Sequence, residues 1–155
     1  MVILRELASE ELDAYRHFFI GEYAEDLSAN CGYSQDKARH QAHLSFVQSL
    51  PDGINTIGNK IYRIENNYRL VGYLWYGLND GGASVYIKDF CILPEFQRQG
   101  FGKASLQALE AELVTQGIFE IKLRVAADNP RAKKLYEQLE FTVTGFNMVK
   151  TLNKP

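Results

Sequence analysis

Residues 93–104 read Leu-Pro-Glu-Phe-Gln-Arg-Gln-Gly-Phe-Gly-Lys-Ala, and they join a β-rich run (84–93) to a run with helical periodicity (103–116). The joint holds two glycines two residues apart, with basic residues on both sides. Such a loop points several unpaired backbone N–H groups of a helix N-terminus at one place, where an anion can bind. Gly100 and Gly102 lack a Cβ, so a phosphate can approach the main chain closely. The stretch therefore predicts a pyrophosphate-binding loop.

The sequence limits the other interpretations of this loop. A glycine loop can serve only as a turn between a strand and a helix, and Gln97-x-x-Gly100-x-Gly102 taken alone does not separate the two roles. A P-loop needs four residues between its glycines followed by Lys-Ser/Thr, and a dinucleotide fingerprint needs a third glycine. Neither pattern is present, so these two nucleotide-binding motifs are excluded.

The composition predicts one globular domain over residues 1–155, because 46% of the residues are apolar and no linker or repeat interrupts them. A net charge of −2 argues against nucleic acid as a partner, and no apolar run approaches the roughly 18 residues of a membrane span. Cys31 and Cys91 are isolated, so the sequence indicates neither a disulfide framework nor a metal site. We expect a cytoplasmic protein.

Periodicity and cap residues predict the order of elements before the loop. We expect a strand at 2–7, helices at 9–28 and 34–50, a hairpin of strands 60–65 and 68–78, and a strand at 84–93. Ser9 and Ser34 stand where N-caps belong, and Asn66-Asn67 is a pair that tolerates the positive φ of a tight hairpin.

The elements after the loop continue an α/β pattern. We expect a helix at 103–116, a strand at 118–126, a helix from Pro130 to about Leu139, and a last strand at 141–152. Gly117 stands where a left-handed C-terminal cap belongs, and Asn129 precedes Pro130 as an N-cap. The order of strands and helices predicts a domain built around a mixed sheet.

A second cluster of residues lies on the last predicted helix. Asn129 and Tyr136 are seven residues apart, which is two helical turns, so they share one face of the helix. Tyr136 also belongs to an apolar stripe with Ala132, Leu135 and Leu139. On this evidence alone, Tyr136 can be a core residue and Asn129 only a cap.

Taken together, the two clusters carry a resemblance to a known family. The segment from Ile92 to Ala104, followed by Asn-Pro-Arg-Ala-Lys-Lys-Leu-Tyr-Glu-Gln-Leu-Glu-Phe at 129–141, resembles the GNAT superfamily of acetyl-coenzyme A-dependent N-acetyltransferases. The resemblance covers roughly residues 84–146, and the order of the preceding elements agrees with it. It implies the acyl-CoA N-acyltransferase fold, in which a central mixed, mainly antiparallel β-sheet is flanked by helices.

The resemblance also implies how acetyl-CoA binds. The backbone N–H groups of Gln97, Arg98, Gln99, Gly100, Phe101, Gly102 and Lys103 would hold the pyrophosphate. Ile92 and Leu93 would pair through their main chain with the pantetheine arm, and Asn129 would bind that arm from the other side. Tyr136 would lie near the thioester sulfur. Arg98, Lys103 and Lys133 would meet the outer phosphates.

The predicted reaction is direct attack of a primary amine on the thioester. Tyr136 is the expected general acid, because a phenol with a pKa near 10 can supply a proton to a thiolate with a pKa near 8.5. Asp89 is the candidate base, because a two-residue repeat places it on an apolar face with Ile87, Cys91 and Leu93, which raises a carboxylate pKa. A structural role for Asp89, with a water chain as the base, stays open.

Two residues depart from the family pattern. Arg124 stands where some members of the superfamily carry a glutamate base, which removes one family solution for that role. Glu140 stands where a glycine is usual, and a left-handed conformation there would cost a non-glycine residue ~1 kcal/mol. The Arg124 departure keeps open a rival function, a non-catalytic acyl-CoA-binding or sensing module.

The acceptor is predicted only as a class, a small-molecule or peptide amine. By position in the fold, its cleft would be shaped by Glu22, Tyr23, Asp26, Trp75, Tyr76 and Phe146. His40 and His43 can share a helix face but have no third ligand, so we interpret them as surface or packing residues. A homodimer is compatible with the sequence, although no residue specifies its interface.

Overall fold

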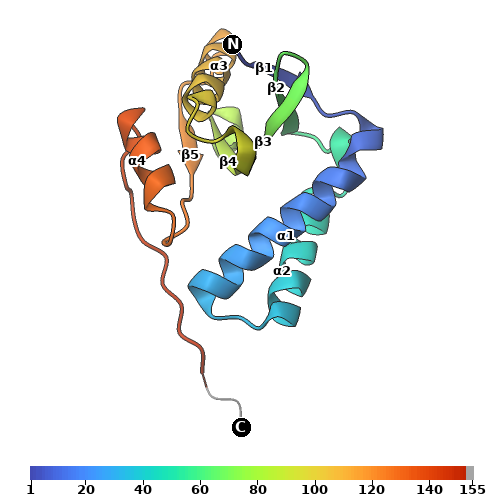
Figure 1. The fold of residues 1–155 in the computed structure, drawn as a ribbon, viewed down its shortest axis with the longest axis vertical. Helices are drawn as coiled ribbons and strands as arrows, with labels where there is room; N and C mark the ends of the chain where they lie inside the picture. Colours follow the sequence, from blue (N-terminus) through green and yellow to red (C-terminus); the bar gives the residue numbers. More distant parts are fainter. Residues whose placement is uncertain (153–155) are drawn as a thin grey trace.

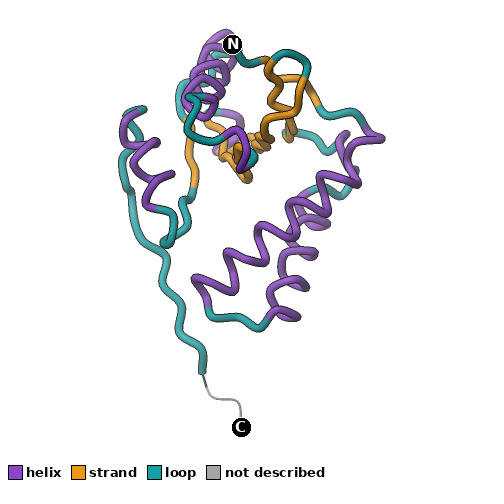
Figure 2. Tube along the Cα trace, viewed as in Figure 1, coloured by secondary structure: helices purple, strands orange, loops and turns teal. Residues whose placement is uncertain are grey.

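The computed structural model describes residues 1–152, and its elements follow the predicted order as far as the fourth α-helix (Figure 1). The strands are β1 (Ile3–Glu6), β2 (Asn59–Asn66), β3 (Arg69–Asn79), β4 (Ser84–Ile92) and β5 (Ile121–Leu123). The α-helices are α1 (Leu12–Cys31), α2 (Gln35–Ser49), α3 (Phe101–Thr115) and α4 (Pro130–Gln138). Figure 2 shows the strands gathered in the body of the molecule, with the α1–α2 pair on one side and α3 on another.

The strands of the described residues form one sheet in the order β1-β2-β3-β4-β5. Strands β1 to β4 are antiparallel neighbours, whereas β5 runs parallel to β4 with Val85 opposite Ile121. The prediction of a mixed, mainly antiparallel sheet flanked by helices is therefore confirmed. The β2–β3 hairpin turns through Asn67 and Tyr68, whose φ angles of 51° and 65° suit a type I′ turn. This turn lies one residue later than the predicted Asn66-Asn67 pair.

The face of the sheet under α1 and α2 holds an aromatic core. Alternate residues of β3 reach this face, so Tyr73 and Trp75 meet aromatic side chains from both helices. The ring of Trp75 lies 5.3 Å from that of Phe19 and 5.7 Å from that of Phe46, measured between centroids. These contacts fix α1 and α2 firmly against the sheet.

The opposite face of the sheet is covered mainly by α3. Leu106, Leu109 and Leu113 lie three or four residues apart, so they form one buried stripe of that helix. They pack against side chains of β2, β3 and β4 that point away from the aromatic core: Tyr62, Ile64, Leu74, Tyr76, Val85 and Ile87. The helix ends at Thr115, and Gly117 shortly after it has a φ of 76°, which confirms the predicted left-handed glycine at this end.

The predicted N-caps have different outcomes. The Ser34 hydroxyl accepts a hydrogen bond from the Lys37 N–H (3.2 Å), so this cap of α2 is confirmed. Ser9 does not cap α1, because it lies inside a 3-10 turn at Ser9–Glu11 that precedes the helix. At this end the Glu11 carboxylate accepts from the Ala8 N–H (2.9 Å) instead.

A β-bulge in β4 changes the face on which Asp89 lies. On β3, Trp75 and Tyr76 are consecutive, but they oppose Asp89 and Ile87, so Lys88 is the extra residue. Ile87 consequently packs on the α3 face, whereas Asp89 and Cys91 lie on the α1–α2 face. The prediction that Asp89 shares a face with Ile87 is wrong, because it assumed an uninterrupted two-residue repeat.

The C-terminal part of the chain has less β-structure than predicted. The expected strand at 118–126 is reduced to β5, and residues 141–152 form no strand within this chain. Figure 1 shows the latter segment leaving α4 and continuing past the body of the molecule. The prediction of a strand at 141–152 is therefore wrong, because no neighbouring strand in residues 1–152 supplies its hydrogen bonds.

Candidate active site

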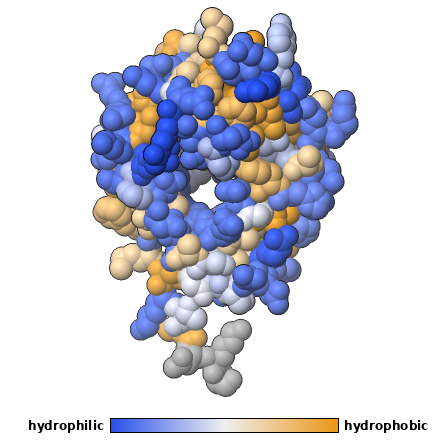
Figure 3. Space-filling view, in the orientation of Figure 1, coloured by the Kyte–Doolittle hydropathy of each residue, from blue (hydrophilic) through white to orange (hydrophobic). Residues whose placement is uncertain are grey.

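A deep cleft of about 1140 Å³ lies where β4 and β5 stop pairing. The two strands pair only at 85–87 and 121–123, so residues 88–92 of β4 and 123–126 after β5 form opposite walls. Residues of α1, α4 and the 97–103 loop complete the lining. Figure 3 shows a hollow near the centre of this face, surrounded largely by hydrophilic residues.

The glycine loop has the geometry of an anion site. Gly100 is the N-cap of α3 with a φ of 83°, and Arg98 two residues earlier also has a positive φ of 64°. The first backbone bond of the helix runs from the Ala104 N–H to the Gly100 carbonyl (3.1 Å), so the N–H groups before Ala104 have no helical partner. A Cβ on Gly100 would meet no atom within 4 Å, which leaves open space beside the loop.

Gly102 has a structural role besides the predicted approach of a phosphate. A Cβ at this position would come within 3.2 Å of the Leu135 side chain of α4, and near Ile92. Gly102 therefore allows α3 and α4 to approach each other closely, whereas Gly100 supplies the left-handed turn.

Basic side chains surround this end of the cleft. Those that line it are Arg98, Lys103, Arg131 and Lys134. Lys133, which the resemblance places at the outer phosphates, pairs with Glu137 (3.2 Å) and does not line the cleft. In the sequence Arg131, Lys133 and Lys134 form one basic cluster, but helical spacing puts Arg131 and Lys134 on a different face of α4 from Lys133. Gln99 also lies outside the lining, and its amide donates to the Glu95 carbonyl.

The backbone of β4 faces the cleft at alternate residues. Leu93 directs its N–H to the Val71 carbonyl (2.8 Å) and accepts from the Phe96 N–H (2.9 Å), so neither group is free for a ligand. In an antiparallel pair the next residue points the other way, so Ile92 turns its backbone toward the cleft. The Gln97 side chain donates to the Ile92 carbonyl (2.9 Å) and connects the loop to this edge. Pairing of the Ile92 backbone with the pantetheine arm stays a prediction. The Leu93 backbone cannot pair in this way, because both of its groups are already bonded.

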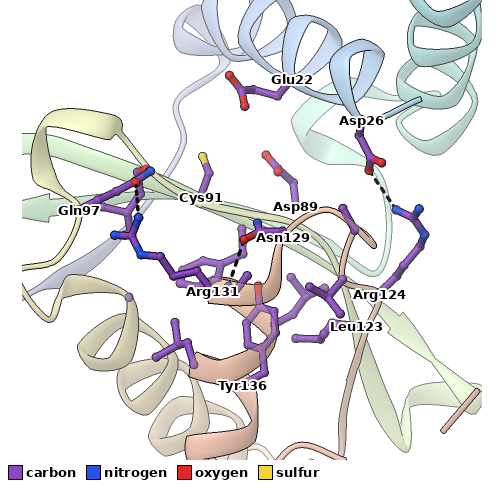
Figure 4. Close-up of a pocket in the computed structure, with 18 of the residues that line it drawn as sticks. Glu22, Asp26, Asp89, Cys91, Gln97, Leu123, Arg124, Asn129, Arg131 and Tyr136 are labelled. Carbon is purple, nitrogen blue, oxygen red and sulfur yellow. Dashed lines mark hydrogen bonds and ion pairs between the residues drawn. The ribbon is translucent and has the colours of Figure 1, made fainter. Parts of the chain in front are cut away.

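Helix α4 carries Asn129 and Tyr136 to the cleft from below in Figure 4. The Asn129 side-chain oxygen accepts from the Ala132 N–H (3.0 Å), as predicted for an N-cap, and its NH₂ group stays available. The Tyr136 hydroxyl points into the cavity. Burial, followed by the nearby Asp89 and Cys91, raises the pKa of Tyr136 to about 12, so its hydroxyl is protonated at neutral pH.

Asp89 enters the same cavity from β4 (Figure 4). The Tyr15 hydroxyl of α1, which is fully buried, donates to the Asp89 carboxylate at 2.5 Å. Burial raises the pKa of Asp89 to about 6; the hydrogen bond from Tyr15 opposes this rise, and the Glu22 carboxylate adds to it. Sequence reasoning missed Tyr15, because the two residues are 74 positions apart and no local pattern relates them.

The remaining predicted residues lie on several sides of the cleft. Cys91 lines it, and burial raises the pKa of this thiol well above its usual value, so it is protonated and a poor nucleophile. Arg124 pairs with Asp26 (3.0 Å) across the cleft, joining the chain after β5 to α1. Among the acceptor candidates, Glu22, Tyr23, Asp26 and Trp75 line the cleft, whereas Tyr76 and Phe146 do not.

Residues 1–152 were also compared with two other expectations, a metal centre and a membrane-spanning helix. Within that range no three His, Cys, Asp or Glu side chains are grouped so that they can hold a metal ion. No helix of the described residues has the length and apolar character needed to cross a membrane. His40 and His43 are both exposed on α2.

The fold and the site together define an acyl-CoA-dependent acyltransferase: a sheet that opens at β4 and β5 over a glycine loop and a helix N-terminus. The chain belongs to the acetyltransferase (GNAT) family, whose model matches residues 12–141. The resemblance found in the sequence is confirmed. Members of this family use acyl-CoA and acetylate amine acceptors.

Individual relatives agree with this assignment. The uncharacterized N-acetyltransferase YycN of Bacillus subtilis is 28% identical over 154 residues, which is 97% of this chain and 99% of YycN. The YycN crystal structure aligns with 99% of this chain and 100% of its own, with a TM-score of 0.91. A predicted acetyltransferase of Clostridium acetobutylicum, solved with acetyl-CoA, shares the fold at 14% identity, with a TM-score of 0.68 over 97% of this chain and 96% of its own.

A further relative matches only part of the chain. The ribosomal protein bS18-alanine N-acetyltransferase of Salmonella typhimurium is 46% identical over 53 residues, which is 34% of this chain and 36% of that protein.

Proposed function

We propose that this protein transfers the acetyl group of acetyl-CoA to a primary amine by direct attack on the thioester. One observation carries the proposal: the Tyr136 hydroxyl and the Asp89 carboxylate enter one cleft from α4 and β4, beyond a loop built to bind an anion. A proton donor and a proton acceptor thus share the space that a thioester and an amine would occupy.

The residues present fit acetyl-CoA as a substrate. The free N–H groups at the start of α3 and the open space beside Gly100 suit a pyrophosphate, and Arg98, Lys103, Arg131 and Lys134 supply positive charge around it. The outward-facing backbone at Ile92 and the free NH₂ group of Asn129 suit the two amides of the pantetheine arm. This arrangement would direct the thioester toward Asp89 and Tyr136.

In the proposed reaction, the amine nitrogen bonds to the acyl carbon and the carbon–sulfur bond breaks. The Asp89 carboxylate, ionised above its pKa of about 6, takes the proton that the nitrogen loses after attack. The Tyr136 hydroxyl donates to the departing sulfur. Because the pKa of Tyr136 is about 12, its main contribution is a hydrogen bond that stabilises the thiolate charge, with solvent supplying the final proton.

The acceptor end of the cleft favours a cationic amine. Glu22, Glu25 and Asp26 line it from α1, and Asp128 faces them. Arg124 pairs with Asp26 and neutralises part of that charge. We therefore expect acceptors that carry a second positive charge to react faster than neutral amines of the same size.

The first test is a thiol-release assay with acetyl-CoA and an amine panel of polyamines, amino sugars, amino acids and peptides. One of the peptides begins with alanine, because the partial match to an alanine N-acetyltransferase makes that acceptor a direct question. Release of coenzyme A that depends on one acceptor class supports the proposal. Tight binding of acetyl-CoA with no release on any acceptor favours a sensing module, which the Arg124 departure keeps open.

The second test is the substitution Tyr136→Phe. It should lower kcat ten-fold or more and leave the KM for acetyl-CoA nearly unchanged, because it removes the hydroxyl and keeps the ring that packs on Phe141. Tyr86→Phe is the matched control, since Tyr86 also lines the cleft but comes from the far end of β4. An unchanged kcat in Tyr136→Phe removes the Tyr136 hydroxyl from the proposed reaction, as hydrogen-bond donor and as acid.

A further inference from the structure

The β-bulge in β4 brings a lysine side chain to the cleft. Lys88 is the extra residue of the bulge, and it directly precedes Asp89, which contacts α1 through its hydrogen bond with Tyr15. The Lys88 Nζ atom lies 5.3 Å from the centre of the Trp75 ring, and Trp75 belongs to the aromatic core under α1 and α2. A regular strand would place consecutive side chains on opposite faces, but the bulge places Lys88 and Asp89 on the same one. Both residues line the cleft.

Neighbouring residues fix the position of the Lys88 side chain. Its Nζ atom donates to the Asn59 side-chain oxygen (3.1 Å), which also accepts from the Trp75 indole N–H (2.9 Å). The Lys88 stem crosses Gly77 of β3, where a Cβ would come within 3.0 Å of the Lys88 Cε atom. Glycine weakens the interior of a strand, and here it leaves the space that the lysine fills. The ammonium group therefore has a defined place at the cleft wall.

The Lys88 ammonium has no anionic partner in residues 1–152. None of the ion pairs of this part of the chain includes it, whereas Arg124, which also lines the cleft, pairs with Asp26 (3.0 Å). Partial burial lowers the pKa of Lys88, and no carboxylate opposes that fall. An anion that binds beside such a group stabilises its charged form. Asn59 uses one N–H of the ammonium, so the other N–H groups can donate to that anion.

Two hydroxyl groups line the cleft near the same ring. Ser45 and Ser49 are one turn apart on α2, so they share a face of that helix. Phe46, between them in sequence, has its ring 5.7 Å from that of Trp75, and the Lys88 ammonium lies over the same Trp75 ring. An ammonium together with hydroxyl donors suits a carboxylate, because each of its two oxygens can accept more than one hydrogen bond.

The charges of the cleft are separated around Asp89. Glu22, Glu25 and Asp26 line the cleft from α1, and Figure 4 shows Glu22 and Asp26 above Asp89 in that view. Lys88 supplies positive charge from β4, one residue before Asp89. A molecule that carries both ammonium and carboxylate groups can therefore meet an opposite charge at each of them.

We propose that Lys88 binds a carboxylate of the acceptor, and that the acceptor is consequently a basic amino acid, with a carboxylate and two amines. This inference rests on the proposed function, because it takes the cleft as the acceptor site. The reacting amine would lie beside Asp89, and the second amine would lie toward the acidic residues of α1. The contact with Lys88 adds a charge-assisted hydrogen bond, which typically changes affinity about ten-fold or more.

The first experiment compares ligands that differ only in the carboxylate: lysine with cadaverine, and ornithine with putrescine. Both members of each pair have two amines, so the number of positive charges is constant. Calorimetric titration in the presence of coenzyme A measures the Kd values without turnover. In at least one pair, the amino acid should bind about ten-fold more tightly than its diamine, or better. Equal or weaker binding of the amino acid in both pairs overturns the proposal, and so does the absence of binding by all four compounds.

The second experiment repeats these titrations with variants. Lys88→Met keeps a stem over Gly77 and Trp75 but removes the charge, so it should reduce the ratio of the diamine Kd to the amino acid Kd about ten-fold. Lys88→Arg keeps the charge and should retain most of the ratio, a rescue that a packing role of the stem would not produce. Lys60→Met is the matched control, because Lys60 pairs with Glu6 (3.2 Å) and does not line the cleft. A ratio that stays unchanged in Lys88→Met overturns the proposal.

The thiol-release assay distinguishes this inference from the proposed function. Carboxylate-dependent binding that is lost in Lys88→Met, without release of coenzyme A from any acceptor, would support the Lys88 site and contradict acetyl transfer. Release that is as fast with cadaverine and putrescine as with lysine and ornithine, together with equal Kd values, would support acetyl transfer and contradict the Lys88 site.

Discussion

The two walls of the cleft are built very differently. The α1–α2 wall rests on a dense aromatic core, with Tyr15, Phe19 and Phe46 buried against Trp75. The α4 wall has no fully buried residue, and the segment that follows it is exposed. The base candidate Asp89 is held from the first wall through Tyr15, whereas the acid candidate Tyr136 belongs to the second. The α1–α2 wall therefore positions one of the two proposed catalytic residues, and the α4 wall carries the other.

Two alanine substitutions, one in each wall, should show the difference in packing most strongly. Phe46→Ala should cost about 3–5 kcal/mol of unfolding free energy, because it opens a cavity in the aromatic core. Leu139→Ala on α4 should cost about 1 kcal/mol, because its side chain is only partly buried. Denaturant unfolding of the two variants measures both values. Equal losses would contradict the contrast between the walls.

The next effect concerns Asp89 itself. Asp89→Asn should lower kcat/KM about 100-fold at neutral pH, which is typical for the loss of a general base. In the unmodified protein, kcat/KM should rise with pH through about 6, because the carboxylate form is the active one and its fraction grows across that pKa. The pH profile of the variant should lack this acid limb. A loss of less than threefold, with the limb retained, would assign the proton to a water chain and leave Asp89 a structural role.

A substitution of Tyr15, in the α1–α2 wall, tests how that wall affects Asp89. Tyr15→Phe keeps the buried ring and removes the hydrogen bond to Asp89, so the folded state should lose little packing. That hydrogen bond lowers the pKa of Asp89, hence its removal should raise the pKa further and move the acid limb of kcat/KM to higher pH. The kcat/KM at neutral pH should fall about ten-fold and recover in part at alkaline pH. A purely structural role for Tyr15 would lower activity equally at all pH values.

The α4 wall and the glycine loop beside it were easier to predict from the sequence than the α1–α2 wall. The signals there are local: Asn129 before Pro130 indicates a cap, and the paired glycines indicate a strand-to-helix loop. The α1–α2 wall depends on contacts between distant parts of the chain. No local sequence pattern could therefore predict that Tyr15 lies beside Asp89. The bulge at Lys88 likewise arises from the pairing of β4 with β3, and a strict two-residue repeat cannot reveal it.

The segment 141–152 shows a different limit of sequence reasoning. Its β-branched, proline-free composition is typical of a strand, but composition does not say which strand lies beside it. Within one described chain it has no neighbour, so the predicted strand is absent.

The smallest expected effect is a change in stability at the end of α4, where the helix meets residues 141–152. The C-terminal end of α4 has a Schellman cap, in which the Phe141 N–H donates to the Tyr136 carbonyl (2.9 Å) and the Glu140 N–H donates to the Glu137 carbonyl (3.1 Å). Glu140 has a left-handed conformation in this cap (φ 71°), and glycine avoids the steric cost of a Cβ there. Glu140→Gly should therefore raise the unfolding free energy by about 1 kcal/mol, whereas Glu137→Gly, inside the same helix, should lower it by about the same amount. Thermal melts of both variants measure the two signs. Stabilisation by Glu140→Gly with unchanged kcat would show that the cap supports the wall without touching the chemistry. A lower unfolding free energy in Glu140→Gly would mean that a contact of the Glu140 side chain stabilises the fold by more than the backbone strain costs. That contact would then help to hold α4 against the sheet.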